Sequence, residues 1–285
     1  MKRYPFGKFI LDVPDDHRIS AIHAVNSLYD RTFGIIAEFV ASEQPNGTIV
    51  DIGANVGDTA AAFATVCGNP ILCVEGNPEF LSYFNANKRH FGDQVSLIEA
   101  FVRAKALESL EFLYEGGTGT GAMSVANASD SPRDDSLSFV SLGDIKQTIE
   151  QRGSDVVLFK TDTDGMDGYL IDEAIETFDC PLFFECDTNA ILEGVPNPWP
   201  EVFSKLDRLG YAVVLFDNHG LPMVVADSSV GSVLRDLSGY THLQRTVHPV
   251  RIHYLDVWAF PKNWSDTANR IFECLRSDFL KPYRF

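Results

Sequence analysis

Basic residues are scarce in this chain of 285 amino acids. Lysine and arginine number 23 against 40 aspartates and glutamates, so the formal net charge is -17. Binding to nucleic acid needs clustered cationic side chains for the phosphates, so this balance argues against such a partner. Docking on an anionic membrane surface is disfavoured for the same reason. A small or weakly charged substrate is the natural expectation.

Long apolar runs and paired cysteines are also lacking. No uninterrupted apolar run approaches the ~18 residues of a membrane span, and no apolar segment follows Met1–Pro5 as in a secretory signal. The five cysteines form no C-x-x-C pair, which indicates buried, reduced thiols rather than a metal or disulfide framework. We therefore expect a cytoplasmic protein.

One stretch has the pattern of a ligand-binding turn. The apolar run 48–52 stops at Gly53, small residues continue to Gly57, and a helix-forming segment begins near Ala60. Strand, glycine turn and helix open the nucleotide-type sites of α/β proteins. Gly53 and Gly57 allow the backbone to bend and to approach a ligand closely.

Further apolar runs predict the rest of a sheet. They cover residues 71–75, 95–100, 156–162, 181–185, 211–216 and 253–260, and helical segments separate most of them. This alternation predicts an α/β fold with a doubly wound, seven-stranded, mostly parallel sheet. Acids follow four of the strands, at Asp51, Glu75, Asp162 and Glu185. Ligands of such sheets bind at the carboxyl ends of the strands, so these acids mark the expected site.

Two regions lie outside this rhythm. Residues 1–47 predict a strand and helices that cover the sheet, in front of a main domain over residues 48–285. Residues 107–142 predict an inserted β-hairpin with strands near 110–114 and 137–142 and a glycine-rich stretch at 116–121. That stretch is not a phosphate-binding P-loop, because no Gly-Lys-Ser/Thr follows it.

Three segments together resemble a known family. Residues 50–59 resemble motif I of class I S-adenosylmethionine-dependent methyltransferases, which have a Rossmann-like fold. Residues 74–78 (VEGNP) and 159–167 (FKTDTDGMD) are similar to the FkbM subgroup of that family. Asp164 and Asp167 depart from it, since glutamate is usual at both positions. The resemblance covers about residues 48–217 and leaves both ends of the chain unexplained.

The resemblance implies an S-adenosylmethionine site. Its glycine turn would approach the methionine part, with Asp51 fixing the turn or meeting the amino group, and Glu75 would hold the ribose hydroxyls with help from Asn77. Glu99, Ala100 and Phe101 would frame the adenine. The full set of expected cofactor residues is Asp51, Gly53, Ala54, Asn55, Gly57, Thr59, Glu75, Asn77, Glu99, Ala100 and Phe101.

Candidates for the reacting side lie around residue 162. Asp162 fits a general base, an acceptor for the substrate hydroxyl, or a metal ligand. Lys160 is either an activating cation or a structural ion-pair partner, and Glu185 and His219 are further catalytic candidates. Asp162, Asp164 and Asp187 would bind Mg or another divalent cation, and the competing interpretation is that such acids cap helices.

The resemblance implies O-methylation of a hydroxyl on a small molecule, such as a sugar, a glycoside or a polyketide-type metabolite. Cofactor motifs do not determine the acceptor. Methylation of nitrogen or of a macromolecule, and a non-catalytic protein that binds S-adenosylmethionine, therefore stay open. The sequence does not fix the oligomeric state, and a homodimer is among the alternatives.

Overall fold

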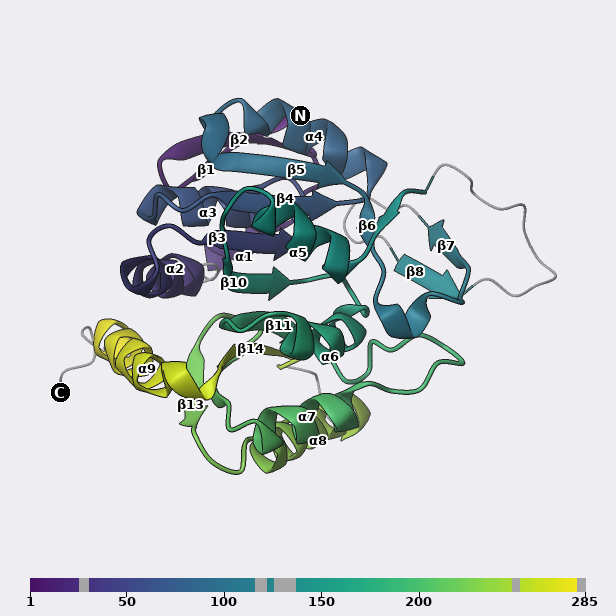
Figure 1. Cartoon of the computed structure of the whole chain (residues 1–285), viewed down its shortest axis with the longest axis vertical. Helices are drawn as coiled ribbons and strands as arrows, with labels where there is room; N and C mark the ends of the chain where they lie inside the picture. Colours follow the sequence, from purple (N-terminus) through teal and green to yellow (C-terminus); the bar gives the residue numbers. More distant parts are fainter. Residues whose placement is uncertain (26–30, 116–121, 126–136, 248–251, 281–285) are drawn as a thin grey trace.

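The computed structural model describes residues 1–25, 31–115, 122–125, 137–247 and 252–280. Within them the central sheet has eight strands. In spatial order these are β13 (Pro222–Ala226), β12 (Ala212–Asp217), β14 (Leu255–Phe260), β11 (Leu182–Cys186), β10 (Val156–Thr161), β3 (Thr48–Ile52), β4 (Ile71–Glu75) and β5 (Val95–Glu99). Figure 1 shows β5, β4, β3 and β10 in this order from the top of the view.

The five strands from β11 to β5 pair in parallel, whereas β14 and β13 are antiparallel to their neighbours. The predicted doubly wound, mostly parallel class is thus confirmed. The sheet has one strand more than the seven expected, because β13 extends its edge beyond β12. The carboxyl ends of β3, β4, β10 and β11 share one edge, which brings Asp51, Glu75, Asp162 and Glu185 to that edge.

Helices cover both faces of the sheet. One face carries α1 (Ile19–Val25), α2 (Arg31–Glu43), α3 (Asp58–Val66), α4 (Pro78–Lys88) and α9 (Ser265–Leu280). The other face carries α5 (Leu142–Glu150), α6 (Asp167–Thr177), α7 (Trp199–Arg208) and α8 (Val230–Val247). Helix α9, which follows the last strand, has no counterpart among the sequence-based predictions.

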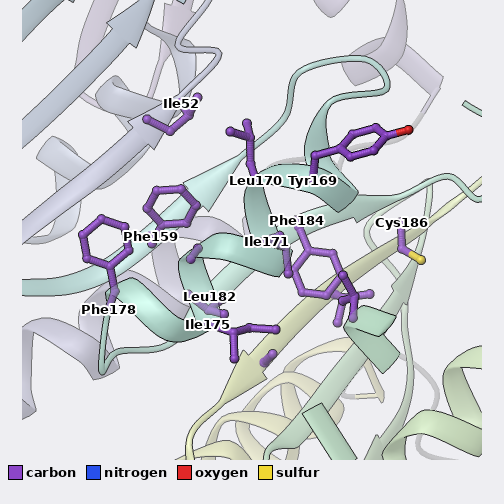
Figure 2. Packing of buried hydrophobic residues seen from close by; sticks show 14 of the residues in the cluster. Ile52, Phe159, Tyr169, Leu170, Ile171, Ile175, Phe178, Leu182, Phe184 and Cys186 are labelled. Carbon is purple, nitrogen blue, oxygen red and sulfur yellow. The ribbon is translucent and has the colours of Figure 1, made fainter. Parts of the chain in front are cut away.

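Apolar side chains along the strands point into one or the other of these two layers. On β10, Phe159 packs towards α6 and stacks on Phe178, while the neighbouring Leu158 joins the opposite layer. Figure 2 shows Phe159 and Phe184 from the sheet facing the apolar side of α6, which carries Leu170, Ile171 and Ile175. The continuous apolar runs of the sequence follow from this burial on both faces.

Short strands flank the main sheet. They are β1 (Lys2–Phe6) with β2 (Phe9–Val13), β6 (Phe101–Val102) with β9 (Phe139–Val140), and β7 (Phe112–Glu115) with β8 (Ala122–Val125). The inserted hairpin is therefore present, and Figure 1 shows it to the right of the sheet. Its second strand is β8, however, because 139–140 pairs with β6 instead. The glycine-rich stretch 116–121 lies outside the described residues.

Three short 3-10 helices complete the described secondary structure, at Gly92–Gln94, Lys105–Leu107 and Lys262–Trp264. All five cysteines are free thiols, as the sequence predicted. Over the described part of the chain, the helices are all too short or too polar to cross a membrane.

Candidate functional site

The glycine loop, residues 53–57, turns sharply at the end of β3. Gly53 has φ +74°, Asn55 φ +49° and Gly57 φ +91°, which are left-handed conformations that glycine adopts without strain. The N–H groups of Gly53 and Ala54 donate to the carbonyl of Val74, at 3.0 and 3.2 Å. A Cβ at position 53 would lie 2.0 Å from the carbonyl oxygen of Asp162. Only glycine therefore lets this loop cross the end of β10.

Glu75, the last residue of β4, holds two backbone turns together. Its Oε2 accepts from the N–H of Asn55 at 2.8 Å, and its Oε1 accepts from the N–H of Asn77 at 2.7 Å. Burial raises the pKa of Glu75 to about 7, although these backbone donors act to lower it. The backbone of Gly76 is a third donor to this carboxylate, which has about four lone-pair sites and so keeps one with which it can accept a ligand hydroxyl.

Asn77 is the N-cap residue of helix α4, and one of the two polar groups of its side-chain amide is already hydrogen-bonded. Its Oδ1 accepts from the N–H of Glu79 at 3.0 Å, which caps the helix. Its Nδ2 is buried and, among the described residues, no hydrogen-bond partner lies near it. Because a buried amide donor without a partner is costly, this group points to a ligand acceptor.

A cavity opens beside these groups. Its walls come from the ends of β3 and β4, from β6, and from the loop after β10. Its lining residues are Ile52, Gly53, Asn55, Val74, Glu75, Gly76, Asn77, Phe80, Ala100, Phe101, Val102, Asp162, Thr163, Asp164 and Met166. One end is thus largely apolar, and the other, between the glycine loop and Asp162, is polar.

The acidic loop, residues 162–167, is held by its own last residue. Asp167 Oδ1 accepts from Thr161 Oγ1 at 2.9 Å, and both Asp167 oxygens accept from the N–H of Thr163 at 3.2 Å. Burial, followed by repulsion from Asp162, raises the pKa of Asp167 to about 6. Asp167 is therefore internal to the loop, and Asp162 and Asp164 are the acids that the loop presents to the cavity.

Lys160 and Asp51 form a buried ion pair below the cavity. Lys160 Nζ lies 3.0 Å from Asp51 Oδ1 and 3.8 Å from Asp162 Oδ2, and both partners of the first pair are at most 2% exposed. Burial would lower the pKa of Lys160, but attraction to Asp51 and Asp162 outweighs it and raises the pKa. The expectation that Asp51 meets the cofactor's amino group needs correction, since its carboxylate does not reach the cavity.

Other predicted cofactor residues also lie outside the cavity lining. Ala54 is 1% exposed, Gly57 turns the chain into α3, and Thr59 is buried within the first turn of α3. Glu99 turns away from the site, where its Oε1 accepts from Asn85 Nδ2 at 3.0 Å. The geometry therefore does not support direct contact of Ala54, Gly57, Thr59 and Glu99 with the cofactor. The sequence could not show this, because the side chain of a strand-end acid or of a loop residue can point towards the cavity or away from it.

Two catalytic candidates lie beyond the cavity. Glu185 is half-buried and stands opposite Asp256 in the antiparallel pairing of β11 with β14. Burial and repulsion from Asp162, Asp167 and Asp256 raise its pKa well above the ordinary value. His219 is exposed in the turn between β12 and β13 and does not line the cavity.

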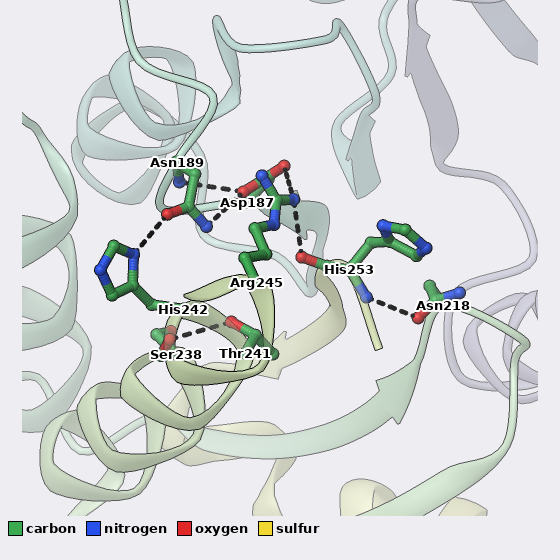
Figure 3. Close-up of polar contacts among 8 residues, drawn as sticks. All are labelled: Asp187, Asn189, Asn218, Ser238, Thr241, His242, Arg245 and His253. Atoms are coloured by element: carbon green, nitrogen blue, oxygen red, sulfur yellow. Dashed lines mark hydrogen bonds and ion pairs between the residues drawn. The ribbon is translucent and has the colours of Figure 1, made fainter. Parts of the chain in front are cut away.

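The predicted metal ligands are not brought together. Asp187 binds Arg245 Nη2 at 2.7 Å and accepts from the N–H of Asn189 at 2.9 Å, so its charge is already neutralised. Figure 3 shows this contact between the end of β11 and helix α8. Across the described residues, no group of three or more His, Cys, Asp or Glu side chains is placed to hold a metal ion. The structure therefore does not bring Asp162, Asp164 and Asp187 together as the predicted metal site.

Several supporting residues carry no signal in the sequence. Figure 3 shows His242 Nδ1 at 2.7 Å from Asn189 Oδ1, and Arg245 donating to the carbonyl of His253 at 2.9 Å. On the other side of the site, Asn87 Nδ2 donates to the carbonyls of Asp12 and Val56, at 2.9 and 2.8 Å. Such contacts join residues far apart in the chain, so no local pattern could have indicated them.

No family model matches the chain, and neither does any curated protein sequence. Solved structures with a similar arrangement include an O-methyltransferase from Bacillus cereus in complex with SAH, with 11% identity, TM-score 0.42, 88% of this chain and 93% of that chain covered. The precorrin-6y C5,15-methyltransferase from Geobacter metallireducens has 13% identity, TM-score 0.36, and 80% and 86% coverage. The fibrillarin pre-rRNA processing protein from Methanococcus jannaschii has 9% identity, TM-score 0.41, and 76% and 67% coverage. Likenesses of this size concern the backbone arrangement and say nothing of substrate.

Proposed function

We propose that the chain is an S-adenosylmethionine-dependent methyltransferase that methylates a hydroxyl oxygen of a small molecule. The main support for the proposal comes from the side chains of Glu75 and Asn77. They present a carboxylate with a spare lone pair and an unpartnered amide donor to one cavity at the end of β4. In nucleotide-binding sheets of this kind, ribose hydroxyls are bound by a carboxylate at the end of the strand that follows the glycine turn and its helix, and β4 is that strand.

The residues present fit an adenosyl group. Glu75 can accept from a ribose hydroxyl, and the Asn77 amide can donate to a ring nitrogen or a ribose oxygen. Next to them Val74, Phe101 and Val102 offer apolar surface to a flat base. A nucleoside placed in this way leaves the polar end of the cavity for the remainder of the cofactor.

The glycine loop and Asp162 form that polar end. When bound, S-adenosylmethionine supplies a sulfonium methyl group, whose C–S bond breaks as a C–O bond forms, leaving a thioether and releasing the hydroxyl proton. The chain's part is to hold the acceptor oxygen in line and to remove that proton. We propose that Asp162, which lines the cavity and whose side chain is 47% exposed, receives it.

Two observations support a small hydroxyl compound as the acceptor. The net charge of -17 disfavours a polyanionic macromolecule, since such a substrate would be repelled. The resemblance of residues 74–78 and 159–167 to the FkbM subgroup supports a hydroxyl of a sugar or a secondary metabolite.

Calorimetric titration with S-adenosylhomocysteine tests the proposal. We expect binding by the folded wild type, weakened about 10- to 100-fold in Glu75→Gln, because hydrogen bonds to a charged group contribute about 1.5–3 kcal/mol. Glu99→Gln is the matched control. It makes the same change at the end of the next strand, outside the cavity, and we expect it to bind as the wild type does.

The outcomes separate the alternatives. A folded wild type without detectable binding would sink the methyltransferase proposal. Binding without turnover, over a panel of sugar, glycoside and polyketide-type hydroxyls, amines and macromolecules, would favour a non-catalytic protein. Turnover confined to an amine or to a macromolecule would overturn the assignment of the acceptor.

A further inference from the structure

The cavity has an uneven balance of charge. Among the described residues that line it, the ionisable side chains are Glu75, Asp162 and Asp164, and all three are acids. Asp162 and Asp164 lie on the acidic loop, and Glu75 lies at the end of β4. Desolvation, followed by repulsion from Asp162, Asp167 and Glu75, raises the pKa of Asp164 to about 7, although the residue is exposed.

The positive charge of Lys160 does not neutralise the acids that line the cavity. Lys160 Nζ is 3.0 Å from Asp51 Oδ1 but 3.8 Å from Asp162 Oδ2, so its first partner is Asp51. Asp51 is fully buried and cancels that positive charge below the floor of the cavity. Asp162, with the ionised fractions of Glu75 and Asp164, whose pKa values are raised to about 7, therefore leaves the cavity with a net negative potential at pH 7.5.

The acids are placed at the end where a positive charge would lie. Glu75 and the apolar residues around Phe101 define the nucleoside end, on the proposed function. The glycine loop contacts Glu75 through the N–H of Asn55 and lies against the backbone of Asp162 at Gly53, so it leads from the ribose-binding carboxylate to Asp162, where the sulfur of the cofactor would follow the ribose. The partnerless Nδ2 of Asn77, a residue only 5% exposed, marks the same cavity as a ligand site independently of these charges.

We propose that Asp162 and Asp164 make the cavity selective for charge, so that it binds the sulfonium form of the cofactor more tightly than the neutral thioether product. This inference rests on the proposed function. The two ligands share the adenosyl group and the amino-acid part and differ at sulfur by a methyl group and a positive charge. Loss of that charge on transfer would weaken binding and favour product release.

The size of the effect is limited by exposure. Opposite charges attract each other substantially at protein–water boundaries, but Asp162 is half exposed and Asp164 is also exposed, and solvent reduces their share. We expect S-adenosylmethionine to bind about 10-fold more tightly than S-adenosylhomocysteine, which corresponds to about 1.4 kcal/mol. An uncharged cavity would show no such preference.

Calorimetric titration of the full chain with both ligands at pH 7.5 tests this. In the wild type, the dissociation constant of S-adenosylhomocysteine should exceed that of S-adenosylmethionine about 10-fold. Asp162→Asn and Asp164→Asn should each lower this ratio several-fold by weakening the sulfonium ligand. Asp93→Asn is the control, because it makes the same change at an exposed acid of a 3-10 helix outside the cavity and should keep the wild-type ratio.

If a variant fails to fold, the ratio of the two dissociation constants in the wild type still decides whether the cavity is selective for charge. Raising the salt from 0.05 to 0.5 M should also shrink the ratio, because screening weakens a charge interaction that remains partly exposed. Equal or tighter binding of the thioether by the wild type would overturn the inference while leaving the proposed function intact. If neither ligand binds, the proposed function itself fails.

Discussion

Lys160 Nζ lies 3.0 Å from Asp51 Oδ1, and the two residues are direct partners in the parallel pairing of β10 with β3. Both side chains are buried, and each lies two residues before a loop begins, Asp51 before the glycine loop and Lys160 before the acidic loop. The ion pair therefore fixes the register of the two strands whose ends form the polar end of the cavity.

Removing one partner of this pair should be far more costly than removing both. Lys160→Met leaves the Asp51 carboxylate buried without a counter-charge, and we expect it to lower the free energy of unfolding by about 3–5 kcal/mol. The double variant Asp51→Asn with Lys160→Met removes both charges and should recover most of that loss. Chemical denaturation of the wild type, both single variants and the double variant measures the coupling. Additive losses would contradict this account of the pair.

Asn87 should be the most sensitive polar residue of α4. Its side chain accepts from the N–H of Asp12 at 2.7 Å and donates to the carbonyls of Asp12 and Val56. Asn87→Ala leaves these three buried backbone groups unsatisfied and should cost about 3 kcal/mol in free energy of unfolding. Asn85→Ala, two residues away on the exposed side, should cost about 0.5 kcal/mol or less. Similar losses in both variants would refute the role given to Asn87.

Stability should depend on the ionisation of Glu75. Its folded-state pKa is raised to about 7 from an ordinary value of 4.5, mainly by burial. A folded state that holds its proton more tightly is favoured at low pH and loses stability as the pH rises from about 4.5 to about 7. Between pH 5 and pH 8 the wild type should therefore lose about 2 kcal/mol relative to Glu75→Gln. Urea denaturation of both proteins across this range measures it, and a constant difference would count against the raised pKa.

The contact of Arg245 with Asp187 should stabilise the fold without affecting the cofactor end. This pair is only partly buried, so we expect Arg245→Met to cost about 1 kcal/mol. Affinity for S-adenosylhomocysteine should stay at the wild-type value, since both residues lie outside the cavity lining. Arg235→Met, at an exposed position of the same helix, is the control. A large loss of affinity in Arg245→Met alone would show that this network supports the cofactor.

The sequence was most informative where structure is local. Continuous apolar runs located the parallel strands because those strands are buried on both faces, and Gly53 located the turn because only glycine fits against Asp162. Glu75 accepts hydrogen bonds from the backbone of residues 55 and 77. These residues lie within the motif segments 50–59 and 74–78, so the motifs could indicate this part of the site.

What remained hidden depends on the direction of side chains and on distant contacts. Glu99 ends a strand as Glu75 does, yet it turns outwards to Asn85, and no pattern distinguishes the two. The sequence predicted Asp187 as a metal ligand, but in the structure Arg245, 58 residues later in the chain, neutralises its charge. Helix α9 was missed because it packs against α2, β12 and β13, which lie elsewhere in the chain, whereas β13 is a short strand that begins at Pro222 and pairs with the preceding strand β12.

The link between Asp12 and Asn87 has a consequence for how the chain matures. These residues are 75 positions apart, and the Asn87 amide that binds Asp12 also holds Val56 of the glycine loop. During synthesis the N-terminal hairpin would leave the ribosome long before this partner exists. The support of the glycine loop thus belongs to late, long-range folding events, and slowing synthesis between these positions would prolong the exposure of the hairpin's apolar side.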